Sequence, residues 1–253
     1  MSFFQELSSR NFALFVFGAI SLLGFVVCVT LAFVTDKQVL GINAWIKPAK
    51  FFISTTIFVW SMGWYMHHLS HAGIVNAYTW TVIFVLGFEL FYISGQAMLG
   101  QTSHFNISTD YHATMWSLMG GLIMIMTLFT ALVGTLFFSS SITLPVGYLW
   151  GIRLGILFFV IFAFEGALMG ARLSHTVGGN DGGAGLQFLN WSIKHGDLRV
   201  AHFVGMHALQ ILPLVGYFVF PSLLGILSFS TIYLFLAATI LWQALRGIPF
   251  ISG

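Results

Sequence analysis

Seven long apolar runs constrain this chain more than any other feature. An α-helix needs about 20 mostly apolar residues to cross a hydrocarbon layer roughly 30 Å thick. Runs of about this length cover residues 12–35, 51–66, 77–99, 113–138, 148–171, 200–220 and 223–245. The pattern predicts an all-α, polytopic membrane protein. We expect a single transmembrane domain over residues 1–253, built as a seven-transmembrane-helix bundle.

The scarcity of charge agrees with this prediction. The chain has 9 Lys and Arg and 7 Asp and Glu, a charged share of 6%, whereas soluble domains carry about 25%. Hydrophobic residues make up 58% of the chain. These values exclude a water-soluble fold and make the lipid bilayer the expected partner. A net charge of +2 offers no basic surface for a nucleic acid.

The connections between the runs are unequal in length and polarity. Those at residues 36–50, 100–112 and 172–199 are longer and more polar than the others, and alternate connections lie on the same side of a membrane. Together with the C-terminal tail, that side holds seven of the nine basic residues: Lys37, Lys47, Lys50, Arg172, Lys194, Arg199 and Arg246. The positive-inside rule therefore predicts a cytoplasmic C-terminus and an N-terminus outside.

Histidine is concentrated on the same side. Six of the nine histidines are expected there: His104, His112, His175, His195, His202 and His207. The remaining three form the segment His67-His68-x-x-His71 on the opposite side. We interpret that triplet as an exposed interfacial cluster, because other histidine boxes of the kind found in membrane di-iron enzymes are missing.

Two carboxyl groups fall inside the apolar runs. Glu89 shares a helical face with Gln96, and Glu165 shares one with Arg172, because residues seven apart lie on one side of a helix. Ionisable groups at such depth are expensive and face the bundle interior. Glu89 and Glu165 are therefore candidate catalytic acids. Asp197 is a third, and it is also placed to cap the helix that follows.

Several of these side chains suit a metal or a haem. Neutral imidazoles ligate iron and zinc, and basic side chains pair with haem propionates or an anionic substrate. The candidate metal ligands are His104, His175, His202 and His207. The candidate cofactor-binding residues are Lys47, Lys50, Gln96, Asn106, Arg172, Arg199 and Gln210. The expected cofactor is haem b or a transition metal, zinc or iron, and the spacing does not choose between them.

These residues predict a one-sided, histidine-rich polar cavity. The leading hypothesis is a metal- or haem-dependent membrane oxidoreductase or hydrolase that acts on a lipid or a quinone-like small molecule. One alternative is a proton-coupled small-solute transporter in which Glu89 and Glu165 carry the proton. Another is a ligand-binding or sensory membrane protein without catalysis. A microbial rhodopsin is excluded, because residues 223–245 contain no lysine to bind retinal.

Five sequence blocks carry a resemblance to a known family. They are Asn43–Phe51 (NAWIKPAKF), Gln101–Asn106 (QTSHFN), Tyr148–Gly155, His175–Gly178 and Asp197–Gln210 (DLRVAHFVGMHALQ). The chain resembles an uncharacterised bacterial family of seven-helix integral membrane proteins with no known activity. The resemblance implies a location in the bacterial inner (plasma) membrane and assigns no role to any residue.

Overall fold

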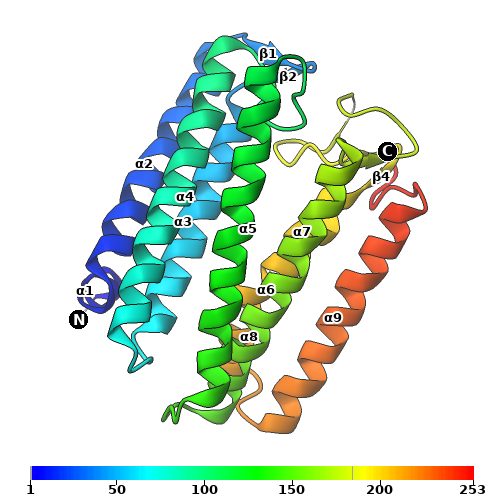
Figure 1. Ribbon diagram of the computed structural model, residues 1–253. Coiled ribbons are helices and arrows are strands. Elements are labelled where there is room, and N and C mark those ends of the chain that lie inside the picture. The colour runs from blue at the N-terminus through cyan, green and yellow to red at the C-terminus, as the bar shows by residue number, and fades with distance from the viewer. Residues whose placement is uncertain (1, 184) are drawn as a thin grey trace. The chain divides into compact units, whose positions relative to one another are not determined.

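The computed structural model describes residues 2–183 and 185–253. Within these ranges the chain forms nine helices and two antiparallel pairs of two-residue strands (Figure 1). The all-helical prediction is therefore confirmed. The chain divides into two compact units, Met1–Met126 and Thr127–Gly253, and each is described by itself.

The first unit contains four helices and the beginning of a fifth. They are α1 (Phe3–Arg10), α2 (Phe12–Val34), α3 (Ile46–Met66), α4 (Ala72–Leu99) and α5 (Asp110–Ser139), which continues into the second unit. Strands β1 (Gln38–Val39) and β2 (Ile42–Asn43) pair between α2 and α3.

Local sequence explains where the helices of the first unit begin and end. Ser2 and Gln5 form a capping box at the start of α1. The side chain of Asn11 accepts a hydrogen bond from the backbone of Leu14 and caps α2. Gly100 ends α4 in the left-handed region, with φ of 71°, which glycine adopts without steric cost.

The second unit holds the rest of α5 and four further helices. They are α6 (Val146–Arg172), α7 (Leu198–Met206), α8 (Ala208–Phe218) and α9 (Leu223–Leu245). Between α6 and α7 the chain forms β3 (Thr176–Val177) and β4 (Gly196–Asp197), which pair with each other.

A glycine stripe brings α6 and α8 into contact at their backbones. Gly147, Gly151 and Gly155 follow one another at intervals of four on α6. A Cβ atom placed at Gly151 would lie 2.5 Å from the carbonyl oxygen of Leu212, and one at Gly155 would lie 2.9 Å from that of Ala208. Small residues at this spacing are the usual means by which membrane helices approach closely.

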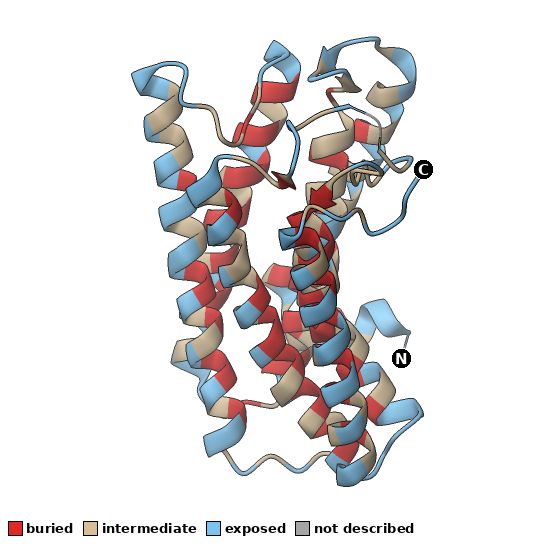
Figure 2. Ribbon diagram, turned by 90° about the vertical axis from the view of Figure 1, so that its right-hand side faces the viewer, coloured by how far each residue is buried: buried red, intermediate tan, exposed pale blue. Residues whose placement is uncertain are grey.

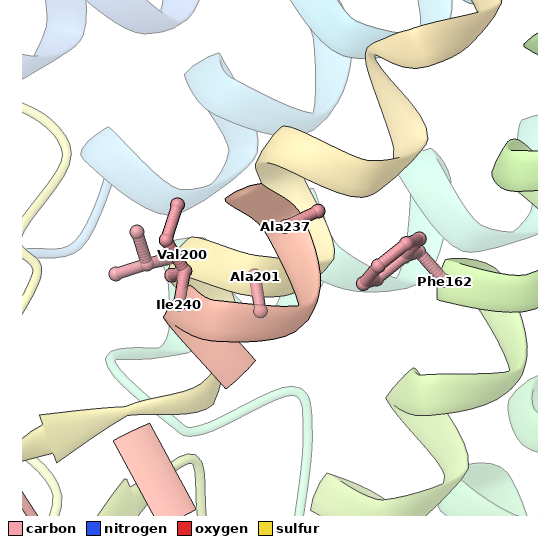
Figure 3. Packing of buried hydrophobic residues seen from close by; sticks show 5 residues of the cluster. All are labelled: Phe162, Val200, Ala201, Ala237 and Ile240. Atoms are coloured by element: carbon pink, nitrogen blue, oxygen red, sulfur yellow. The ribbon is translucent and has the colours of Figure 1, made fainter. Parts of the chain in front are cut away.

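The core of the second unit joins three helices. Phe162 of α6, Val200 and Ala201 of α7, and Ala237 and Ile240 of α9 are all buried and form one cluster (Figure 3). The phenyl ring of Phe162 occupies the space that a side chain at Gly205 would need. This packing holds α7 beside α6, which positions the polar groups described below.

The sixth apolar run is not one straight helix. Its two parts, α7 and α8, meet at His207 with a bend of 41°. In an unbroken helix the carbonyl of Val204 would accept a hydrogen bond from Ala208. Here it accepts one from the hydroxyl of Tyr233, on α9, at 2.5 Å.

The helices match the predicted runs, but seven membrane spans are not confirmed. Among the described residues, five helices are long and apolar enough to cross a membrane, namely α2, α4, α5, α6 and α9, and there are six if the bent pair α7–α8 counts as one span. The predicted span at 51–66 lies in α3, which is not among them and carries Ser54, Thr55 and Thr56. Exposed residues recur along the long helices (Figure 2), including Leu23 and Phe33 of α2, as expected for helices that face lipid.

Candidate functional site

In the first unit a buried carboxyl meets an imidazole. Glu89, on α4, is only 7% exposed. Its Oε1 lies 3.6 Å from Nε2 of His104, in the loop between α4 and α5. This separation is within ion-pair reach but longer than a hydrogen bond. Two of the residues predicted for the site are thus brought together.

Ser103 and Lys47 influence the protonation state of His104. The hydroxyl of the buried Ser103 lies 3.2 Å from Nδ1, so Nδ1 can accept its proton while Nε2–H faces Glu89. Burial, followed by the positive charge of Lys47, lowers the pKa of His104 well below its usual value. We therefore expect a neutral imidazole at pH 7.

Aromatic rings surround this imidazole. The ring centroids of Phe51 and Trp116 each lie 5.4 Å from that of His104, and that of Phe105 lies 6.3 Å away. The rings shield the pair from water, which strengthens any electrostatic interaction between Glu89 and His104.

Other predicted residues of the first unit have different surroundings. Gln96 is buried two turns after Glu89, and its Oε1 has no hydrogen-bond partner among the described residues. Asn106 is engaged within its own loop, where its amide donates to the carbonyl of Thr102 and its oxygen accepts from Ser108. Lys47 and Lys50 lie in the first turns of α3. The charge of Lys47 contributes to the lowered pKa of His104.

A second carboxyl–imidazole pair lies in the second unit. Oε2 of Glu165, on α6, is 3.3 Å from Nδ1 of His202, on α7, and the Glu165 side chain is 6% exposed. Neither oxygen of Glu165 has a hydrogen-bond partner among the described residues. A buried carboxyl without such a partner is costly when ionised.

The backbone of α6 fixes the orientation of His202. Nδ1 lies 2.7 Å from the carbonyl oxygen of Phe162. Because a carbonyl only accepts, Nδ1 carries the proton, and Nε2 of the neutral ring is unprotonated. Gly166 leaves room for the ring, since a Cβ atom there would lie 3.0 Å from Cε1 of His202.

His207 stands at the break between α7 and α8. Its Nδ1 lies 3.1 Å from Oε1 of Gln210, and its ring packs edge-on against Phe203 at 4.2 Å between centroids. The amide oxygen only accepts, so Nδ1 of His207 is also the protonated nitrogen. Two predicted residues, His207 and Gln210, are therefore partners of each other.

Asp197 binds Arg199 and joins the loop to α7. Its side chain is fully buried, caps α7, and accepts two hydrogen bonds from the guanidinium of Arg199, at 2.9 and 2.6 Å. Burial raises the pKa of Asp197, but the hydrogen bonds and charge of Arg199 and the nearby His175 outweigh this effect and lower it.

His175 lies between two aspartates. Its Nδ1 is 3.4 Å from Oδ1 of Asp181 and 3.7 Å from Oδ1 of Asp197. Asp181 also accepts hydrogen bonds from Ser174 and Thr176. These contacts fold the segment from Ser174 to Asp181 into a compact turn. Arg172, in the last turn of α6, is exposed.

Each of the four predicted metal ligands has a different neighbour within its own unit. His104 faces Glu89, His175 faces two aspartates, His202 faces Glu165 and His207 faces Gln210. Within the part of the chain that the structure describes, no three His, Cys, Asp or Glu side chains gather closely enough to hold a metal ion. A metal or haem centre stays a prediction.

Three groups were not identified from the sequence, two at the carboxyl–imidazole pairs and one at the helix break. The carbonyl of Phe162 has no sequence signal at all, since any residue offers a carbonyl. Ser103 lies beside His104 in a block that was already suspected, and its buried position gives it a role. Tyr233 could have been found as a hydroxyl inside an apolar run, where such groups commonly hydrogen-bond to another helix.

No protein-family model matches this chain, and neither a curated protein nor a solved structure is significantly similar to it.

Proposed function

We propose that this chain is a proton-coupled carrier of a small solute, in which Glu89 and Glu165 take up and release the proton. The observation that carries the proposal is the pairing of each buried carboxyl with an imidazole, at 3.6 Å for Glu89 and 3.3 Å for Glu165. Carboxyl and imidazole groups inside membrane helices are the usual components of proton relays.

The geometry of the second pair supports a relay in particular. His202 holds its proton on Nδ1, 3.3 Å from Oε2 of Glu165. Its side chain is 29% exposed, and in the proposed relay Nε2 takes up the incoming proton. Uptake of a proton on Nε2 lets the ring pass the Nδ1 proton to the carboxylate, which becomes a neutral acid. The net change is one proton taken up at Nε2 of His202 and one delivered from Nδ1 to Glu165.

The broken helix supports transport rather than a purely structural pair. Transporters commonly place their sites at discontinuous helices, where backbone groups are freed from helical bonding. The break between α7 and α8 lies about one turn after His202. The carbonyl that it frees, that of Val204, is bound by Tyr233.

We also propose a membrane location and an orientation of the termini for this carrier. The resemblance of the five sequence blocks supports a bacterial inner membrane. The excess of basic residues in the longer connections supports a cytoplasmic C-terminus and an external N-terminus. Seven spans require that α3 also crosses the bilayer, and two of its hydroxyl side chains, Thr55 and Thr56, are buried in the structure.

Proteoliposomes loaded with a pH-sensitive dye provide the test. Amino acids, sugars and carboxylic acids are added outside in turn, because a coupled carrier moves protons only with its solute. We expect at least one solute class to acidify the interior. We expect Glu89→Gln and Glu165→Gln to reduce that signal to the level of protein-free liposomes. Asp110→Asn is the matched control, because Asp110 is an exposed acid.

Infrared difference spectroscopy makes the test independent of the solute. Protonation of a carboxylate creates a C=O stretching band that a Gln variant lacks. We expect the protein to show such bands on acidification, with one lost in Glu89→Gln and another in Glu165→Gln. If neither variant changes the bands and no solute drives acidification, the proposal is wrong.

A metal or haem enzyme is the second candidate, favoured by the two histidines of the sixth run. Nδ1 of His202 donates to the carbonyl of Phe162, and Nδ1 of His207 donates to Gln210. Metal-ligating histidines are oriented in this way, with Nε2 directed to the metal. Such a site would serve redox or lipid-directed chemistry on a lipid or a quinone-like molecule.

A visible spectrum and elemental analysis of the detergent-purified protein test this candidate. A Soret band that shifts on reduction with dithionite would support haem b. Bound zinc or iron without that band would support a hydrolase or a non-haem enzyme. Colourless, metal-free protein with solute-driven proton uptake would leave the carrier as the function.

A further inference from the structure

A separate cluster of side chains connects α1 to the end of α3. Arg10, the last residue of α1, donates from Nε to Oε1 of Glu6 at 2.9 Å and from Nη1 to the carbonyl oxygen of Trp64 at 3.2 Å. The same Nη1 lies 3.2 Å from Nε2 of His68. The guanidinium carbon also lies 3.9 Å from the centroid of the Trp64 ring, a cation–π contact.

The contact with Arg10 indicates which ring nitrogen of His68 carries the proton. A guanidinium only donates, so Nε2 of His68 must be the acceptor, and the proton of the neutral ring is on Nδ1. Burial, then the charges of Arg10 and His67, lower the pKa of His68 below its usual value. Geometry and electrostatics therefore agree that the docked helix α1 requires a neutral His68.

The helix α1 can move as one unit relative to α2. Its own capping box holds its first turn, and the single residue Asn11 joins it to α2 in an extended conformation. It docks through Leu7, which is fully buried, and through Phe3, which stacks on Trp64 at 5.3 Å. Phe3 and Phe4 are otherwise half exposed, and a short helix with such a face suits a membrane surface.

We propose that His68 is a pH-sensitive latch that holds α1 against α3 at neutral pH and releases it on acidification. A proton on Nε2 removes the acceptor for Arg10 and places two positive charges about one hydrogen-bond length apart. The charged or titratable groups near His68 are Arg10 and Glu6 on α1 and His67 in its own turn. Glu6 is bound to Arg10 and offsets the repulsion only in part.

The direction of the pH effect follows from linkage. The pKa of His68 is lower when α1 is docked than the value of 6.5 typical of a free histidine. Docking is therefore at full strength above that value and weakens as the pH falls through it. For one linked proton, the docking equilibrium changes by up to about tenfold per pH unit until the docked form is itself protonated.

Spin labelling in lipid nanodiscs tests the latch. A nitroxide is attached after Ser9→Cys in a Cys28→Ala background, because Ser9 is exposed on α1 and Cys28 is the only native cysteine. We expect a mobile component that grows as the pH falls from 8 to 5. His68→Gln should abolish this growth, because a glutamine oxygen accepts from Arg10 and does not titrate. His67→Gln is the matched control and should keep it.

A second measurement needs no label. Imidazole NMR of the unmodified chain reports the pKa of His68, and we expect it to be lower than the value of 6.5 typical of a free histidine. Arg10→Gln should raise the pKa of His68 and leave α1 mobile at every pH. The latch is overturned if His68→Gln retains the pH-dependent mobility, if the parent chain shows none, or if the pKa of His68 is not below that of a free histidine.

Discussion

Glu165 and His202 lie 3.3 Å apart, yet the hydrogen bond from the nearer imidazole nitrogen runs to the carbonyl oxygen of Phe162 at 2.7 Å. The backbone of α6, not the carboxyl, therefore holds the ring in place. The Nδ1 proton of His202 therefore orients the ring and also lies within reach of the carboxyl. Its transfer to Glu165 would break the bond to Phe162 until Nδ1 regains a proton.

The first prediction follows from this geometry. Glu165→Gln removes the titrating group and keeps its shape, so we expect the free energy of unfolding to stay within about 1 kcal/mol of the parent value. The Nδ1–H signal of His202 should persist in NMR spectra of the variant. His202→Ala is the comparison, and it removes both the signal and the interhelical bond. Loss of the signal in Glu165→Gln would show that the carboxyl orients the ring.

The second prediction concerns the hydroxyl of Tyr233, which binds the carbonyl of Val204 at the break between α7 and α8. Tyr233→Phe leaves that carbonyl without its partner in a partly buried setting, which costs about 1–3 kcal/mol. Thermal unfolding in detergent measures the loss. Tyr217→Phe is the control, because Tyr217 is exposed and its change should be neutral. Equal stability of the two variants would mean that the break does not depend on Tyr233.

The third prediction concerns the glycine stripe. A methyl group at Gly151 would meet the backbone of Leu212 and Pro213 at 2.5 and 2.7 Å, so Gly151→Ala must push α6 and α8 apart. We expect a loss of about 3 kcal/mol or a failure to fold, as for other overpacked contacts.

Gly120→Ala is its matched control. Gly120 also lies inside a helix, α5, but no heavy atom lies within 4 Å of a Cβ atom placed there. The substitution should stabilise the protein by up to about 1 kcal/mol, because alanine is the better helix former. If Gly151→Ala behaves like Gly120→Ala, the two helices are not as close as the structure indicates.

The length of the apolar runs was sufficient to place the long helices. It was not sufficient to count the membrane spans. Each of the seven runs is helical, because backbone groups in such a run can only be satisfied within a helix. Hydropathy does not report continuity, however, and the sixth run breaks at His207. The helix α1 was not predicted, since its eight residues are too few for an apolar run. The stripe of Gly147, Gly151 and Gly155 was visible in the sequence and was not used.

The candidate site was predictable in its residue types and not in its pairings. Carboxyl groups within apolar runs are conspicuous, so Glu89 and Glu165 could be singled out. Their partners, His104 and His202, lie 15 and 37 positions further along the chain, and no sequence spacing links a helix to a distant loop or helix. Asp197 was expected both to cap α7 and to act as a catalytic acid. The cap is present, and its carboxylate is bound to Arg199.

The last prediction concerns that bond and its pH dependence. The pKa of Asp197 is lower in the folded chain than its ordinary value of 3.8, as is that of Asp181. A carboxyl with a depressed pKa stabilises the fold above its unfolded pKa and loses that contribution as the pH falls through the folded value. We therefore expect the loop between α6 and α7 to be protected from proteolysis above about pH 4 and to become sensitive in more acidic solution. Asp197→Asn should weaken the loop above about pH 4, by about 2 kcal/mol, because Arg199 loses its charged partner. In more acidic solution its effect should fade, since the parent carboxyl is then neutral as well. Asp36→Asn, a change at an exposed acid, should leave the cleavage rate unaltered. A loop that is equally resistant in Asp197→Asn and in the parent would show that the backbone pairing of β3 and β4 alone is sufficient to hold it.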